Sequence, residues 1–134
     1  MATLDATIYT RLAAVSGVTD IVSTRIYYGW IPQGATLPCV SYTRISTMPV
    51  NGATGHTTES NTRLQVDCWA TTQSGARTLA DAVKAALGGW NNASSPYVAD
   101  ILPISDSDLM ESPDTGSQDP EHRVSMDFSI WWTP

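Results

Sequence analysis

Apolar and polar positions follow two different periods across residues 62–88. From residue 63 to residue 70 they alternate, which is the pattern of a strand with one buried face. After residue 74 the apolar positions recur every three or four residues, the spacing of an amphipathic helix. This stripe comprises Ala76, Leu79, Ala80, Val83 and Leu87. A strand that runs directly into a helix, each with one apolar face, predicts the two layers of one core.

The same two periods predict the remaining elements. Leu4, Ile8 and Leu12 recur at helical spacing in residues 3–15, where Thr3 is a suitable N-cap. Residues 18–24 are expected to connect this helix to the first strand, either covering the sheet edge or making one helical turn. Further strands are expected at 25–30, 39–47, 97–104 and 122–132, because these stretches are rich in β-branched and aromatic residues.

These elements in this order predict an α+β fold. A mostly antiparallel sheet of about five strands would pack against two helices. Pro103 predicts that the strand at 97–104 lies at an edge of the sheet or ends there. At 134 residues the chain is expected to form a single domain, 1–134.

Two polar stretches lack either period and are expected to be long loops, at 48–60 and 105–121. The first holds Pro49, Gly52 and Gly55, and its length suits an arm that becomes ordered on contact with a partner. The second holds six acidic residues. Four of them, Asp106, Asp108, Glu111 and Asp114, form a candidate acidic loop that could face a partner.

Composition narrows the classes of function. The net charge is −6 and only 15% of the residues are charged, against about 25% in typical proteins. No basic stripe would neutralise phosphates, so specific nucleic-acid binding is not expected. No apolar run reaches the length of a membrane span, and the first residues do not resemble a secretory signal. We expect a cytosolic chain in which Cys39 and Cys68 are free and buried.

The sequence shows no motif for catalysis, metal binding or cofactor binding. The acidic stretch departs from the spacing of a calcium-binding EF-hand loop, so it is expected to be solvated charge. Neither cysteine lies in a pattern that would expose a thiolate beside His56 or His122. No nucleophile elbow or phosphate-binding glycine loop occurs. We therefore expect no catalytic residues, no metal and no cofactor.

Aromatic residues are the remaining unusual group. The chain has five tryptophans and five tyrosines, residue types that are enriched at protein interfaces. Trp69 and Trp131 fall on the polar side of their predicted strands, where either this chain or a neighbouring subunit would have to cover them. We favour a neighbouring subunit. The candidate interface residues are Trp69, Arg63, Trp131, Trp30 and His56.

Several stretches, read together in chain order, carry a family resemblance. They are Arg25-Ile26-Tyr27, Pro32 through Pro38, Arg63-x-Gln65-Val66-Asp67-x-Trp69, the Ala-rich helix that follows, and Arg123-x-x-x-Asp127-Phe128. This ordered set spans nearly the whole chain. It resembles the tail-completion family of long-tailed bacteriophages, the tail-terminator or tail-to-head joining proteins long catalogued as a domain of unknown function.

The resemblance implies a non-enzymatic structural protein of the virion, located at the head–tail junction and assembled in the host cytoplasm. Such proteins form homo-oligomeric rings, as hexamers, that cap the last ring of the tail-tube protein, stop its polymerisation and contact the head–tail connector protein. DNA would pass through the lumen without specific binding, since an acidic surface repels its backbone. No membrane contact is implied. The family pattern transfers no individual contact residues.

Two other functions remain open at this stage. The chain could be another head–tail connector or a tail-tube subunit, which would be of similar size. More remotely, it could be a small cytosolic hydrolase with an unrecognised site. A tube subunit should grow into long fibres, whereas a terminator should cap and stop them.

Overall fold

The computed structural model describes residues 3–32, 36–52, 55–94, 96–111 and 121–133; the side chains of 51–58, 110 and 111 lie outside this description. Helices α1 (Leu4–Ala14) and α2 (Ser16–Val22) precede strands β1 (Ile26–Tyr28), β2 (Cys39–Gly52) and β3 (Gly55–Ala70). Helix α3 (Gln73–Leu87) and strands β4 (Tyr97–Glu111) and β5 (Glu121–Thr133) follow.

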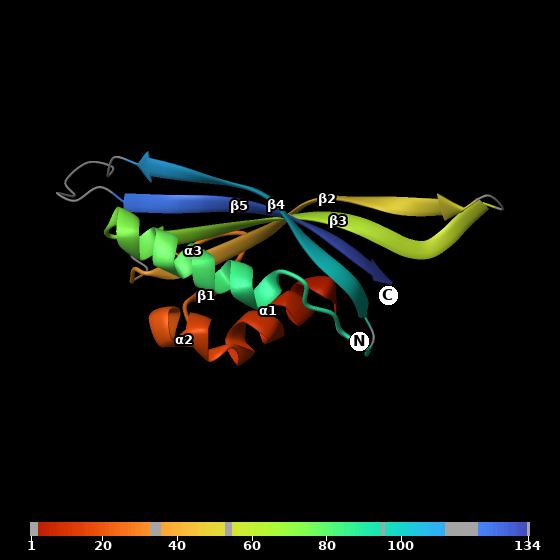
Figure 1. The fold of residues 1–134 in the computed structure, drawn as a ribbon, viewed down its shortest axis with the longest axis horizontal. Coiled ribbons are helices and arrows are strands. Elements are labelled where there is room, and N and C mark those ends of the chain that lie inside the picture. Colours follow the sequence, from red (N-terminus) through yellow and green to blue (C-terminus); the bar gives the residue numbers. More distant parts are fainter. Residues whose placement is uncertain (1–2, 33–35, 53–54, 95, 112–120, 134) are drawn as a thin grey trace.

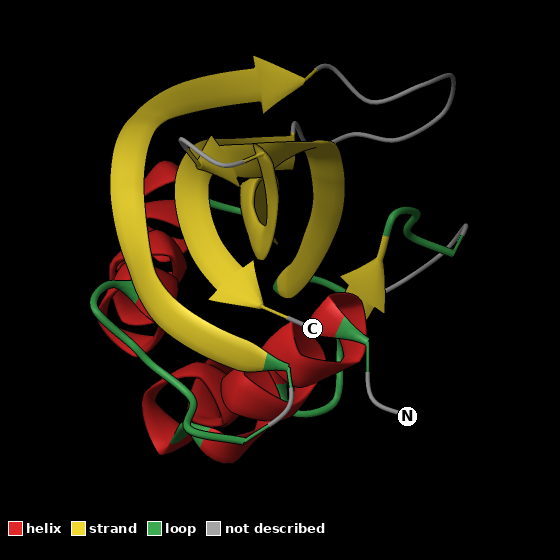
Figure 2. Ribbon diagram, turned by 90° about the vertical axis from the view of Figure 1, so that its right-hand side faces the viewer, coloured by secondary structure: helices red, strands yellow, loops and turns green. Residues whose placement is uncertain are grey.

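The strands form one five-stranded sheet in the order β1-β2-β3-β5-β4. Only β1 and β2 are parallel; the other three neighbouring pairs are antiparallel. All three helices lie on one side of this sheet (Figure 1). The sheet is strongly curved, and β4 follows a wide arc from the helices to the far side (Figure 2). These features confirm the expected α+β class and the edge position of the strand that contains Pro103.

The core lies between the helices and the sheet, and the strand–helix unit at 62–88 supplies much of it. Val66 is paired with Tyr42 on one side and Met126 on the other, so these three side chains share the covered face. The apolar stripe of α3 is completely buried, as its spacing predicted, and so are alternate residues of β3 and β5. The Thr72 hydroxyl caps α3 by accepting from the Gly75 amide at 3.0 Å.

The structure corrects two expectations about irregular segments. Residues 16–22 form a seven-residue helix, α2, so three helices rather than two cover the sheet. The segments expected to be loops, 48–60 and 105–121, both contain strand. In the first, β2 continues to Gly52 and β3 begins at Gly55; in the second, β4 continues to Glu111 and β5 begins at Glu121. Residues 53–54 and 112–120 lie outside the described residues.

For residues 48–60, the reason is the shape of the β2–β3 hairpin. The ladder between β3 and β5 begins at Ser60, so beyond it β2 and β3 pair only with each other. This end of the hairpin projects away from the helices (Figure 1). A two-stranded ribbon that projects from the sheet has no helix-covered face to demand alternating apolar residues, so its sequence carries no strand period.

Candidate assembly surfaces

The sheet face opposite the helices, here called the uncovered face, is mostly polar; Cys39 and Ser41 of β2 are nevertheless buried on it. Residues paired across the strands share this face, as with Ser41, Asp67 and Ser125, which lie side by side on β2, β3 and β5. The row above it joins Thr43, Gln65 and Asp127. Neutral hydroxyl and amide groups therefore alternate with single charges along the face. Such a surface is suited to a wet protein contact rather than to a dry core.

Trp69 and Arg63 both lie on this uncovered face. Trp69 is half-buried: its Nε1 donates to Ser41 Oγ at 3.4 Å, and the Arg123 guanidinium lies 5.0 Å from the centre of its ring. Arg63 lies 2.8 Å from the carboxylate of Asp127, and 52% of its side chain is exposed. Each of these candidates thus has a partner within the chain and a surface left for another molecule.

Trp131 lies on the same uncovered face, opposite Asn61 of β3 and Asp100 of β4, and it is half-buried. Trp30 lies elsewhere, in the segment after β1, and 72% of it is exposed. The structure therefore brings Trp69, Arg63 and Trp131 onto one surface but keeps Trp30 apart. The fifth candidate, His56, lies in β3 opposite Asn51, and its side chain is outside the described residues.

Of the four acidic candidates, only two have side chains that the structure describes. Asp106 and Asp108 lie on β4, and both form ion pairs with Arg77 of α3, at 3.5 Å for Asp106. Hydrogen bonding and the charge of these two carboxylates raise the pKa of Arg77. Glu111 ends β4 with its side chain outside the description, and Asp114 lies wholly outside the described residues. Arg77 is a residue that sequence reasoning missed, because it comes close to these acids only across the fold.

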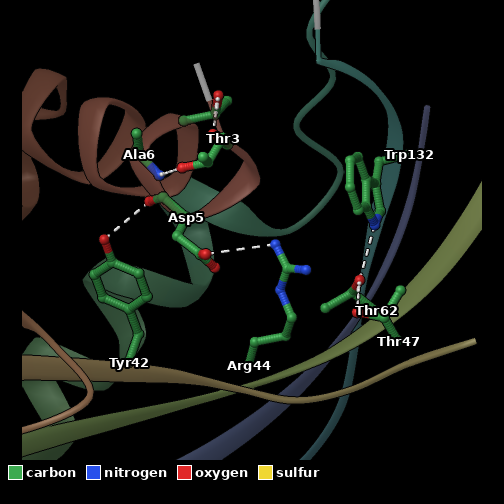
Figure 3. A network of polar contacts seen from close by, with 9 residues as sticks. Thr3, Asp5, Ala6, Tyr42, Arg44, Thr47, Thr62 and Trp132 are labelled. Carbon is green, nitrogen blue, oxygen red and sulfur yellow. Dashed lines mark hydrogen bonds and ion pairs between the residues drawn. The ribbon is translucent and has the colours of Figure 1, made fainter. Parts of the chain in front are cut away.

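A polar network ties the base of the β2–β3 hairpin to the rest of the molecule (Figure 3). Thr47 and Thr62 form a hydroxyl pair at 2.9 Å, and Trp132 Nε1 donates to Thr62 Oγ1 at 2.8 Å. Arg44 lies between the ring of Trp132, 5.5 Å from its centre, and the Asp5 carboxylate, 3.4 Å away. The direction of the hairpin is therefore coupled to α1 and β5.

Tyr42 adds a second link between α1 and β2. Its hydroxyl donates to the Asp5 carbonyl oxygen at 2.9 Å (Figure 3). Burial, and next the nearby Asp5 charge, raise the pKa of Tyr42 to about 12. The phenol therefore stays a donor throughout the neutral range. No periodicity in the sequence would have indicated this contact.

The two thiols are poorly placed to react, and the described carboxylates do not gather into a metal site. Cys39 and Cys68 are free and buried, and burial raises the pKa of Cys39 to about 11 and that of Cys68 further still. A thiol with a raised pKa is a poor nucleophile at neutral pH. Among the described residues, no three His, Cys, Asp or Glu side chains gather as a metal site would require. Within the same residues, no helix has the length and apolar character needed to cross a membrane.

Several exposed apolar side chains at the two edges of the sheet were also missed. Met48 and Ile45 lie on β2, and Leu102, Ile104 and Leu109 lie on β4. Sequence reasoning gave these residues to loops or to covered strands. Their exposure follows from the sheet order, because β4 is an outer strand and β1 covers only part of β2.

The arrangement of three helices on one face of a mixed sheet defines a class of small α+β protein that is also found in a virus-like particle. A solved structure described as "Virion of native gene transfer agent (GTA) particle" contains a chain with a TM-score of 0.77 to this one. The two are 18% identical, and the match covers 98% of this chain and 95% of that one. This likeness establishes the shared fold.

Sequence comparison identifies the family within that class. The model of the family described as Tail completion protein gp17 matches residues 6–133. The chain belongs to this family, which confirms the resemblance seen in its motifs. It is therefore a structural protein of the phage tail, with its place in the virion. No curated protein matches the chain significantly.

Proposed function

We propose that this chain is a tail terminator, a single structural domain that assembles as a homo-hexameric ring on the end of the tail tube. The ring stops polymerisation of the tube protein and presents a surface to the head–tail connector protein. The family match over residues 6–133 is the observation that carries this proposal. The protein acts by contact and is not an enzyme.

The shape of the sheet supports a ring. Subunits in a ring contact each other head to tail, so each must carry two different complementary patches. The two outer strands differ in this way: β1 is three residues long and leaves much of β2 open, whereas β4 is fifteen residues long. Each edge also carries its own exposed apolar side chains.

Electrostatics support free passage of DNA. The chain carries a net charge of −6, so a ring of such subunits repels the phosphate backbone. At the Asp106–Asp108–Arg77 cluster, two carboxylates face one guanidinium, which leaves one negative charge. We assign Asp106, Asp108, Glu111 and Asp114 to the side that faces the lumen or a partner.

Growth of tail tubes tests the capping step directly. Tube protein is polymerised with and without this chain, and tube lengths are measured by electron microscopy. A terminator should yield short tubes with a density at one end and should form rings alone in native mass spectrometry. Long fibres made of this chain itself would identify a tube subunit instead. Normal tube growth, with binding only to the connector, would identify a connector.

The uncovered sheet face is tested through Trp69. Trp69→Ala removes a half-buried ring from this face but leaves the helix-covered core untouched, so it should fold and weaken ring assembly. Circular dichroism and native mass spectrometry separate the two effects. Loss of folding would show instead that Trp69 serves only the monomer.

The proposal that the protein is not an enzyme can be tested separately. A variant with His122 changed to Gln and both cysteines changed to Ala removes both thiols and the one imidazole that is not a candidate interface residue. We expect it to retain tube capping, provided that circular dichroism shows it folded. A folded variant that fails to cap would argue for chemistry at one of these side chains.

A further inference from the structure

A groove of about 340 Å³ lies between α1 and the segment that leads into β4. Its α1 wall is formed by Ala6, Thr10, Arg11 and Ala14, and its other wall by Trp90. The lining is more apolar than polar. The volume lies near the lower limit of the roughly 300–1,000 Å³ seen for ligand pockets, which suits one bulky side chain.

Several polar groups in the groove already have partners within the chain. The Thr10 hydroxyl donates to the Ala6 carbonyl oxygen at 2.9 Å, and Arg11 Nε donates to the Ala86 carbonyl oxygen at 2.9 Å. Asn92 Nδ2 donates to the Pro96 carbonyl oxygen at 3.0 Å. A polar ligand would find few free partners among these groups, whereas an apolar ring would leave none of them unsatisfied.

The groove also offers a specific contact for an aromatic ring. The Arg11 guanidinium lies 5.4 Å from the centre of the Trp90 ring, and its hydrogen bond to Ala86 holds it in place. A second ring in the groove would share this cation, an interaction that grows as the site loses water. Arginine and tryptophan are the residues most enriched at the energetic centres of interfaces.

Trp30 is a matching protrusion on the same chain. At 72% exposure it exceeds every other large hydrophobic side chain of known exposure in the described residues. The turn before it is fixed, because the Gly29 amide donates to the Tyr42 carbonyl oxygen at 2.7 Å and Gly29 has a φ of +80°. The ring is therefore held out from a defined position instead of hanging from a loose end.

Trp30 and the groove are separate patches of the chain. Trp30 follows β1, whereas the groove lies between α1 and the segment in which Asn92 is bridged to Val98 of β4. Its exposure shows that Trp30 does not fill the groove of its own chain. Two unlike patches of this kind are what head-to-tail assembly requires.

We propose that Trp30 of one subunit inserts into the α1–Trp90 groove of the next subunit in the ring. This inference rests on the proposed function, because it names the contact that joins neighbouring copies. The occupant of the groove is thus a second copy of this chain, and the contact repeats around the ring.

Matched variants on each side of the contact test it. Trp30→Ala removes the protrusion, and Ala14→Trp fills the groove from within. Ala13→Trp is the control, since Ala13 is an exposed neighbour on α1 that does not line the groove. The concentration at which half the chain is in rings is measured by mass photometry, after circular dichroism confirms folding. Trp30→Ala and Ala14→Trp should raise it by about tenfold or more, and Ala13→Trp should leave it unchanged.

Mixing the two defective variants gives a sharper result. The Trp30→Ala chain keeps its groove and the Ala14→Trp chain keeps its Trp30, so one native contact remains between them. The mixture should form one-to-one heterodimers that grow no further, seen by native mass spectrometry. Neither variant should dimerise alone under the same conditions.

The outcomes separate this inference from the proposed function. If the unchanged chain forms no rings, both fail. If it forms rings that Trp30→Ala and Ala14→Trp leave intact, this inference fails alone. Intact rings that no longer bind tube protein would assign the groove to the tube partner and overturn a second copy as its occupant.

Discussion

Thr62 shows how one buried hydroxyl joins three strands. Its side chain is fully buried in β3, where Oγ1 accepts from Trp132 of β5 and pairs with the hydroxyl of Thr47 of β2. A hydroxyl supplies one donor and two acceptor sites, so it can satisfy both partners at once. The part-buried indole N–H then has a partner inside the protein. Thr62 stabilises the fold mainly because it keeps the Trp132 N–H from being left without an acceptor.

Replacement of Thr62 by valine tests this role. The change keeps the shape but leaves the Trp132 N–H without its acceptor, so the free energy of unfolding should fall by about 1–3 kcal/mol. Urea titration measures the loss. Thr47→Val is the matched control: Thr47 is exposed, and the Thr62 hydroxyl remains available to Trp132. Equal losses in the two variants would contradict this account.

Burial of the Cys39 thiol and the Tyr42 phenol predicts weakening at alkaline pH. Their pKa values are raised in the folded chain from 9.0 to about 11 and from 10.0 to about 12. Above about pH 9 the unfolded chain loses protons that the folded chain retains, so stability falls as pH rises. Below that pH the contribution is fully present. Urea titrations at pH 8 and pH 10.5 should show the fall.

A cysteine variant isolates the thiol contribution. Cys39→Ala removes one of the buried acidic groups and leaves Tyr42 and Cys68, so the loss of stability between pH 8 and pH 10.5 should become smaller. The same loss in both proteins would show that Cys39 does not contribute. In the folded chain at pH 8 both cysteines should also react slowly with a thiol reagent, and denaturant should make them reactive.

At the scale of elements, α3 organises the covered face. It packs against β3, β4 and β5, and its small residues, among them Ala76, Ala80 and Ala86, bring the helix close to the sheet. The chain turns sharply after it, where Gly89 has a φ of +75° and its amide donates to the Ile101 carbonyl oxygen at 2.8 Å. The helix thereby sets where β4 begins its path along the edge of the sheet.

A charge in the stripe of α3 should unfold the monomer. Val83 is completely buried, so Val83→Asp would place an unpaired carboxylate in the core and should cost more than about 4 kcal/mol. Ala85→Asp is the control, because Ala85 lies on the exposed side of the same helix. Thermal unfolding should show a folded Ala85→Asp variant and little or no transition for Val83→Asp. A stable Val83→Asp variant would contradict the assigned core.

At the scale of the whole molecule, the covered core and the projecting hairpin are separate parts. The core holds the helices against the sheet, while beyond Ser60 the hairpin consists of two strands alone. A two-stranded ribbon is marginally stable in water, so we expect contact with another protein to stabilise this part of the hairpin. The Arg44–Trp132 contact and the Thr47–Thr62 pair fix it at its base.

Shortening this hairpin should separate folding from assembly. Pro49 and Ser60 are paired, so residues 50–59 can be replaced by the turn Asn-Gly without disturbing the register below. The melting temperature should change by only a few degrees, because none of the buried residues of the described core lies in this range. Capping of tail tubes should be lost, as seen by electron microscopy. A shortened chain that still caps tubes would show that the hairpin is dispensable.

Local pattern was enough to predict the strand–helix unit and the alternation of β5. Val66 and Phe128 are buried and Gln65 and Asp127 lie on the uncovered face, as expected, because a helix or strand with one covered face shows it in its period. The α+β class and the family followed from the order of these elements and their motifs. The same alternation placed Trp69, Arg63 and Trp131 on the polar sides of their strands, and strand pairing then brings them onto one surface.

Tertiary structure decided what depends on pairing between distant residues. The strand character of the hairpin comes from pairing between its two strands, since a projecting ribbon has no helix-covered face to leave a periodic signal. The Arg77 ion pairs and the groove between Arg11 and Trp90 join side chains from separate elements. Sequence alone determined which faces are apolar; the sheet order determined which edges, pairs and grooves those faces create, because register and strand order are properties of the whole chain.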